Sequence, residues 1–166
     1  MRIIGGKYKG LKLNSPDNLK IRPTSDKIKE AIFSIIESQK FSSSIQDKSF
    51  LDLCSGSGAM ALEAFSRGAK IVYLVEISNT SLNLLSNNIK KLNLIENERD
   101  KLIILKGNVL RLKKLGLPQF DFIYIDPPYD KKYSKIILKN LNECKVINNK
   151  TLIFFETNKL LDDCPE

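Results

Sequence analysis

The sequence predicts an α/β fold in which a mainly parallel sheet is covered by helices on both faces. Short apolar segments alternate with amphipathic ones from residue 49 onward, which is typical of parallel strands joined by crossover helices. A glycine-rich turn, Gly56-Ser57-Gly58, follows the first apolar segment. Ligands of such sheets bind at the carboxyl ends of the strands, so this turn marks one wall of a predicted crevice.

We expect five strands and three helices in the core, residues 49–166. The strands are short runs of Ile, Leu, Val and Phe, as expected for a sheet that is buried on both faces. The longest helix carries Leu82, Leu85 and Ile89 on one stripe. The expected strands are Phe50–Cys54, Ile71–Val75, Leu102–Leu105, Phe120–Ile125 and Leu152–Phe155, and the expected helices are Ala59–Ser66, Asn79–Leu92 and Tyr133–Leu141.

Residues 1–48 are expected to form a basic extension of the same domain. Two short extended pieces, Arg2–Ile4 and Leu11–Leu13, are separated by glycines at turn positions and predict a hairpin. A helix is expected to start at Pro23-Thr24-Ser25 and to end near Ser38, because isoleucines and alanine recur there at helical spacing.

Charge and composition narrow the possible chemistry. The formal net charge is +8, and residues 1–30 contribute +5 because they hold eight Lys and Arg and three acids. A basic segment on a modest domain suggests an anionic partner such as RNA or DNA. The chain has no histidine, which excludes Ser-His and Cys-His nucleophiles and the common His metal sites.

Cysteine usage and hydropathy point to the cytoplasm. Cys54, Cys144 and Cys164 have no metal-like spacing, so we expect neither a disulfide framework nor a bound metal. Apolar runs are too short for a membrane span, and residues 1–6 lack the apolar core of a signal peptide. We expect a monomer without a membrane partner.

The glycine-rich turn and the next strand together predict a nucleoside site. Gly56 and Gly58 let the backbone turn tightly and approach a ligand. Glu76, at the end of the second strand, can accept hydrogen bonds from two ribose hydroxyls. The same glycine spacing fits a nicotinamide dinucleotide, so an oxidoreductase stays open as an alternative. Asp52 argues against it, because a carboxylate there repels a pyrophosphate and attracts an ammonium group.

A second motif, Asp126-Pro127-Pro128-Tyr129, follows the fourth expected strand. The exocyclic amine of a base attacks poorly because its lone pair is delocalised into the ring. Asp126 and the Pro127 carbonyl can each accept a hydrogen bond from that amine, and the prolines fix φ and hold these acceptors rigid. Tyr129 can stack on a flipped or unpaired base. The motif predicts methylation of an amine from S-adenosylmethionine, whose sulfonium is a good leaving group.

Several of these motifs resemble those of the RsmD family of bacterial 16S rRNA (guanine-N2)-methyltransferases over essentially the full length. The amino-terminal pieces are residues 2–10, RIIGGKYKG, and residues 22–27, RPTSDK, which general methyltransferases lack. Residues 51–58, LDLCSGSG, resemble the family's first motif. The resemblance implies a Rossmann-like S-adenosylmethionine-dependent methyltransferase fold with strand order 3-2-1-4-5.

The resemblance also implies roles for individual residues. The cofactor would be held by Asp52, Ser55, Gly56, Gly58 and Glu76, with Asn108 beside the adenine. The guanine amine would be held by Asp126, Pro127, Pro128 and Tyr129. The RNA partner would be 16S ribosomal RNA within a small-subunit assembly particle. It would be contacted by Arg2, Lys7, Lys9, Arg22 and Lys27.

The sequence departs from the family at a few positions and leaves other acceptors open. Asn108 stands where the family usually has Asp, and Lys27 where it usually has Arg. The chain ends at Glu166, where the family usually continues into a hairpin, so we expect an exposed sheet edge. Enzymes that methylate adenine N6 in DNA or glutamine in proteins use similar tetrapeptides, and a non-catalytic RNA-binding relative is a further alternative.

Overall fold

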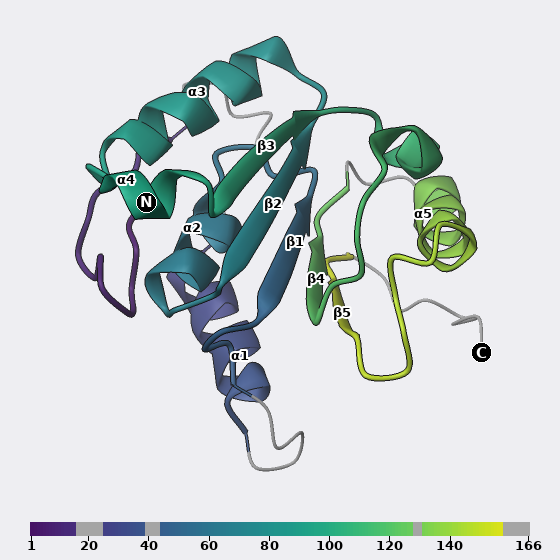
Figure 1. Cartoon of the computed structure of the whole chain (residues 1–166), viewed down its shortest axis with the longest axis horizontal. Coiled ribbons are helices and arrows are strands. Elements are labelled where there is room, and N and C mark those ends of the chain that lie inside the picture. The colour runs from purple at the N-terminus through teal and green to yellow at the C-terminus, as the bar shows by residue number, and fades with distance from the viewer. Residues whose placement is uncertain (16–24, 39–43, 128–130, 158–166) are drawn as a thin grey trace.

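A five-stranded parallel sheet forms the centre of the molecule in the computed structural model, which describes residues 1–15, 25–38, 44–127 and 131–157. The strand order β3-β2-β1-β4-β5 confirms the order that the sequence resemblance implied (Figure 1). The strands are β1 Ser49–Leu53, β2 Ile71–Glu76, β3 Leu102–Lys106, β4 Phe122–Ile125 and β5 Leu152–Phe155. The helices are α1 Asp26–Ile36, α2 Ala59–Ser66, α3 Asn79–Lys90, α4 Glu96–Arg99, the 3-10 segment η2 Val109–Leu115 and α5 Lys131–Glu143.

Strand β1 lies at the middle of the sheet and pairs with β2 on one side and β4 on the other. Asp52 is therefore aligned with Leu74 of β2 and Tyr124 of β4. Because all strands are parallel, their carboxyl ends share one edge. The segments that follow β1, β2, β3 and β4 consequently meet there.

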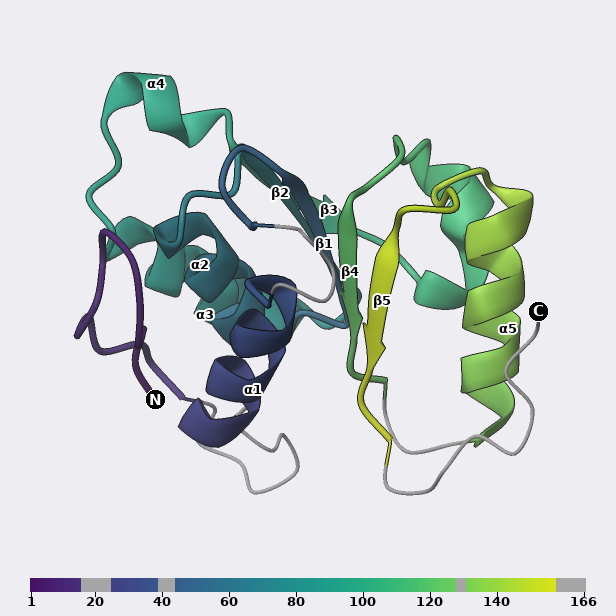
Figure 2. The ribbon, with the colours of Figure 1, turned by 90° about the horizontal axis from the view of Figure 1, so that it is seen from below.

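Helices cover both faces of the sheet, as Figure 2 shows from below. One apolar cluster joins the strands to α1, α2 and α3, with Phe33 and Leu85 fully buried. The other joins the opposite face to η2 and α5 through residues such as Leu112 and Ile137. Successive strand residues alternate between the two clusters, which is the period of two expected of strands. None of the helices described is long and apolar enough to cross a membrane.

The amino-terminal segment is fastened to α2. It contains one antiparallel bridge, Arg2 to Lys12, and Ile3 is fully buried in the first apolar cluster. The backbone N–H of Ile4 donates to Glu63 Oε2 at 2.8 Å, and the N–H of Lys7 donates to the Ser66 carbonyl at 2.7 Å. The extension therefore packs onto the core instead of standing away from it.

The sequence did not predict two short elements, α4 and η2. α4 is a four-residue polar helix without an apolar stripe, and η2 interleaves apolar and basic residues with neither a 3.6 nor a 2 residue period. Strand β4 begins at Phe122, two residues later than expected, because the backbone N–H of Phe120 instead donates to the Val146 carbonyl at 3.1 Å. The expected helix start at Pro23-Thr24 lies outside the described residues, and Ser25 caps α1.

Gly6 offers a test of this attachment. Its φ is +73°, and a Cβ there would lie 1.8 Å from the Ser66 carbonyl oxygen. We expect Gly6→Ala to lower the free energy of unfolding by about 3 kcal/mol, because the substitution combines left-handed strain with a backbone clash. Urea-induced unfolding measures this.

Gly10→Ala is the matched control. Gly10 has φ +90°, but a Cβ there would meet nothing within 4 Å. Only the conformational cost of about 1 kcal/mol is expected. Equal losses in the two variants would contradict the close packing of the extension on α2.

Candidate active site

The turn between β1 and α2 has positive φ at three alternate residues. Cys54 has φ +65°, Gly56 +53° and Gly58 +78°. A Cβ on Gly58 would lie 2.3 Å from Cδ1 of Leu85 in α3. A side chain at position 58 would therefore adopt a strained backbone conformation and would have to displace the Leu85 side chain.

Ser55 ties this turn to the strands below it. Its Oγ donates to the Asp52 carbonyl at 2.8 Å, and its backbone N–H donates to the Val75 carbonyl at 3.1 Å. The N–H of Gly58 in turn donates to the Ser55 carbonyl at 2.7 Å. The backbone of the turn is therefore fixed before any ligand binds.

The Glu76 carboxylate links the turns after β1 and β2. Oε2 accepts from the backbone N–H of Gly56 at 2.9 Å. Oε1 accepts from the N–H groups of Ile77 at 2.7 Å and Ser78 at 2.8 Å. Glu76 is buried, so these bonds hold the two turns at a fixed separation. A ligand hydroxyl would share Glu76 with these backbone N–H groups, or replace one of their hydrogen bonds.

Asp52 is a buried carboxylate with one oxygen lacking a hydrogen-bond partner. The residue is 1% exposed, and Oδ2 accepts from the backbone N–H of Ala61 in α2 at 3.2 Å. Among the described residues, Oδ1 has no partner. Burial, followed by the nearby carboxylates of Asp126 and Glu76, holds the pKa of Asp52 well above its usual range.

These three acids also act on Cys54, which lines the same crevice. Burial, followed by the charges of Glu76, Asp52 and Asp126, raises the pKa of the Cys54 thiol to about 12. The group stays a neutral thiol near pH 7 and is no nucleophile there. The crevice thus favours a cationic ligand and disfavours an anionic one.

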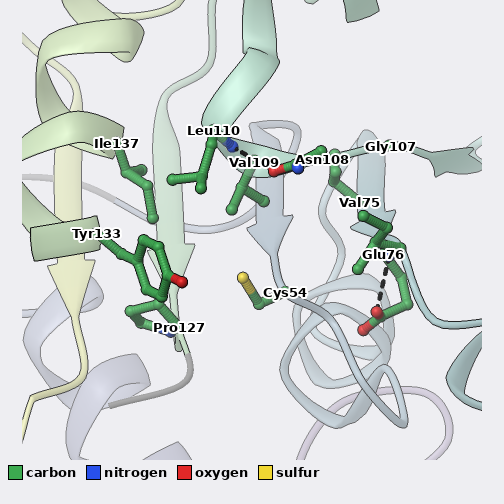
Figure 3. A pocket seen from close by; sticks show the side chains of 11 residues that line it. Cys54, Val75, Glu76, Gly107, Asn108, Val109, Leu110, Pro127, Tyr133 and Ile137 are labelled. Carbon is green, nitrogen blue, oxygen red and sulfur yellow. Dashed lines mark hydrogen bonds between the residues drawn. The ribbon is translucent and has the colours of Figure 1, made fainter. Parts of the chain in front are cut away.

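A cavity of about 190 Å³ opens beside this turn. Figure 3 shows that its wall comes from the ends of β1 and β2, the segment after β3, the end of β4 and α5. Much of the lining is apolar, and Ile77 keeps 57% of its surface exposed. The lining residues are Cys54, Val75, Glu76, Ile77, Gly107, Asn108, Val109, Leu110, Pro127, Tyr133 and Ile137.

Asn108 lies in this wall and caps η2. Its Oδ1 accepts from the backbone N–H of Leu110 at 2.8 Å. The amide oxygen of this residue, which was expected beside the adenine, is thus already engaged in the cap. The side chain is nevertheless in the cavity wall, as Figure 3 shows.

The first half of the tetrapeptide lies at the same edge. The backbone N–H of Asp126 donates to the Leu53 carbonyl at 3.4 Å, which places Asp126 next to the end of β1. Pro127 is buried and lines the cavity. Pro128 and Tyr129 lie outside the described residues.

Sequence reasoning missed several residues of the cavity wall. The ring of Tyr133 lies beside Pro127 and its hydroxyl points into the cavity in Figure 3, although its position at the start of a helix resembled that of an ordinary packing residue. Ile77 follows Glu76 directly, and its position after a strand-terminal acid was the available signal in the sequence. Val109 and Leu110 carried none, because the 3-10 segment was not expected.

Four of the five predicted RNA-contacting cations lie in the described part of the chain, and none of these four lines the cavity. Arg2 Nε lies 3.1 Å from Asp26 Oδ2, and Lys7 Nζ lies 2.6 Å from Glu98 Oε1. Lys9 and Lys27 are exposed. Arg22 lies outside the described residues. Two of the five cations are therefore partly neutralised by carboxylates of the same chain.

A protein-family model described as Conserved hypothetical protein 95 matches residues 1–165. The chain belongs to this family. It is the RsmD family of methyltransferases, as the amino-terminal and glycine-turn motifs predicted. The nicotinamide oxidoreductase that the glycine spacing left open is therefore set aside, in agreement with the acidic crevice.

Individual relatives agree with this membership. Ribosomal RNA small subunit methyltransferase D of Buchnera aphidicola is 34% identical, over 95% of this chain and 78% of its own length. An uncharacterized methylase of Rickettsia prowazekii is 31% identical, over 98% of this chain and 87% of its own. The solved structure of yhhF, a candidate methyltransferase of Escherichia coli, superposes with a TM-score of 0.77 at 26% identity, over 92% and 78% of the two chains. The predicted methyltransferase fold is thus confirmed.

Proposed function

We propose that this RsmD-family protein transfers a methyl group from S-adenosylmethionine to the exocyclic N2 amine of a guanine in small-subunit 16S ribosomal RNA. The observation that carries the proposal is the buried Asp52 carboxylate with an unpartnered oxygen, in a crevice shared with Glu76 and Asp126. The names of relatives such as the Buchnera protein support the choice of ribosomal RNA as substrate.

The residues of the crevice fit this cofactor. S-adenosylmethionine carries a sulfonium and an ammonium group, and a cation near Asp52 would satisfy its unpartnered oxygen. Ser55, Gly56 and Gly58 would shape the turn around the methionine part. Glu76 would accept from the ribose hydroxyls. Asn108 and the exposed Ile77 would border the adenine, because both line the apolar cavity.

Asp126 and Pro127 would act on the acceptor. The Asp126 carboxylate and the Pro127 carbonyl accept hydrogen bonds from the guanine NH2 and turn its lone pair toward the methyl group. Bound S-adenosylmethionine supplies that methyl group on a sulfonium, which leaves as a neutral thioether. The proton that the amine loses passes to Asp126 or to solvent. Positioning and electrostatics supply most of the acceleration.

The rest of the tetrapeptide would hold the base. Pro128 would keep the acceptors rigid, and Tyr129 would stack on the flipped guanine. Tyr133 adds a second aromatic ring beside Pro127. We assign residues 1–48 as an RNA-contacting extension of the same domain as the core 49–166, and we place the reaction in the cytoplasm.

Ion pairs within the chain lower the expected contribution of some amino-terminal cations to RNA binding. Lys9 and Lys27 are exposed and would meet phosphates directly, together with Arg22. Arg2 and Lys7 would exchange Asp26 and Glu98 for phosphate, so each contributes less. A monomer would suffice, because the proposed site is built from one chain.

Asp126→Ala tests the catalytic assignment. We expect kcat for methyl transfer to fall roughly 100- to 1,000-fold, because the amine loses its charged acceptor. The dissociation constant for S-adenosylmethionine should change little. Rapid-quench methyl transfer and calorimetric titration measure the two quantities.

Asp126→Asn is the control, because it keeps one acceptor oxygen of the same size and should retain more activity than Asp126→Ala. Methylation at the wild-type rate by Asp126→Ala would overturn the mechanism. Loss of cofactor binding in that variant would mean that Asp126 belongs to the cofactor site instead.

Asp52 predicts a pH dependence of cofactor affinity. Only the ionised carboxylate attracts the cofactor cation, and burial beside Glu76 and Asp126 raises the pKa of Asp52. Affinity is therefore present above this raised pKa and is lost as the pH falls through it. We expect the weakening to occur well above about pH 4, where an ordinary Asp carboxyl titrates. Titration of S-adenosylmethionine across pH 5 to 8, roughly the physiological span, measures it.

The variant Asp52→Asn should bind at least about tenfold more weakly at pH 8 and lose the pH dependence. Asp100→Asn, a substitution of an exposed acid before β3, is the matched control and should behave as the wild type. A pH dependence that persists in Asp52→Asn would assign it to another group.

A further inference from the structure

Segment η2 carries three exposed cations next to the cavity wall. Arg111, Lys113 and Lys114 are exposed, whereas Leu112 between them is 1% exposed and packs under α5. The chain kinks at Arg111, where φ is −132° and ψ is 41°. Burial of the leucine keeps the basic side chains of the segment at the surface.

These cations differ from those of the amino-terminal extension. Among the residues that the structure describes, no carboxylate lies within 4.0 Å of Arg111, Lys113 or Lys114. Arg2 and Lys7, in contrast, are paired with Asp26 and Glu98. The positive field of η2 is therefore less compensated than that of the predicted RNA-binding hairpin.

A groove of about 330 Å³ runs between η2 and the carboxyl-terminal half of α5. The three cations form one wall, and Asn140, Glu143 and Cys144 contribute the other. Glu143 Oε1 lies 3.6 Å from Lys139 Nζ, so the one acid of the groove has a cation of its own helix beside it.

The groove adjoins the proposed active site. Leu110 lines both the groove and the cavity beside Glu76, and the Leu110 carbonyl accepts from Asn140 Nδ2 at 3.0 Å. The hydrogen bond fixes η2 against α5 at the point where the two hollows meet. The groove is also on the opposite face of the sheet from the amino-terminal extension (Figure 2).

We propose that the η2 groove binds the phosphate backbone of the RNA strand whose target base is held by Asp126 and Pro127, at the edge of the neighbouring cavity. The inference rests on the proposed function, because it takes RNA as the substrate. RNA is favoured over an acidic polypeptide because the adjoining site is assigned to a nucleotide, whose flanking phosphates must lie near its rim. The enzyme would then hold its substrate from both faces of the sheet.

The test compares two double variants with the same change of charge. Lys113→Gln/Lys114→Gln removes two cations of the groove. Lys70→Gln/Lys101→Gln removes two exposed cations that precede β2 and β3 and do not line the groove. Fluorescence anisotropy of a labelled single-stranded RNA, titrated at several salt concentrations, measures binding, and calorimetry with S-adenosylmethionine reports on the fold.

We expect the groove variant to bind RNA roughly tenfold more weakly near 0.1 M salt, and its slope of log affinity against log salt to be shallower by about 1.4, for two lost phosphate contacts on a single strand. The control pair should change the affinity less than about twofold. Cofactor affinity should be that of the wild type in both. Equal weakening in the two pairs would reduce the effect to net charge and overturn the proposal.

Two further outcomes would also overturn it. The first is unchanged RNA affinity in the groove variant. The second comes from a parallel titration with poly-glutamate. If the groove variant lost poly-glutamate binding and kept RNA binding, the groove would be assigned to an acidic polypeptide. Either result, with methyl transfer to RNA by the wild type intact, would remove this inference alone. Absence of methyl transfer by the wild type would remove the proposed function.

Discussion

Three carboxylates, of Asp52, Glu76 and Asp126, meet at the carboxyl edge of the sheet. The site depends on how the negative charge of these groups is balanced by hydrogen-bond donors or by a bound cation. Glu76 is satisfied by three backbone N–H groups from two turns. Asp52 receives one N–H from α2 and keeps an unpartnered oxygen among the described residues. A buried acid without a full set of partners is costly, and a bound cation offsets that cost. The crevice is therefore prepared for a positively charged ligand.

Much of the fold could be predicted from the sequence, because its core elements are strongly patterned. The bounds of α2 and β5 agree with those expected, and the strand order 3-2-1-4-5 is confirmed. Segment η2 could not be predicted, since its leucines and cations follow no regular period and Leu112 is buried only by packing with α5.

The candidate site was only partly predictable. Asp52, the glycines and Glu76 lie in one continuous motif and the strand that follows it, so their meeting follows from parallel pairing. The pairing of Lys7 with Glu98 joins residues 91 positions apart and is invisible in the sequence. Tyr133 likewise enters the cavity only because α5 starts next to Pro127. Of the cations that the amino-terminal motifs suggested for RNA, Arg2 and Lys7 are therefore paired with acids of the same chain, whereas Lys9 and Lys27 are exposed.

The proposed activity is methyl transfer to guanine N2 of small-subunit ribosomal RNA. Its most direct test is incubation of the protein with methyl-labelled S-adenosylmethionine and small ribosomal subunits that lack the modification, followed by nucleoside analysis of the RNA. We expect label in N2-methylguanosine. Label in another nucleoside or in protein, or no transfer at all, would contradict it.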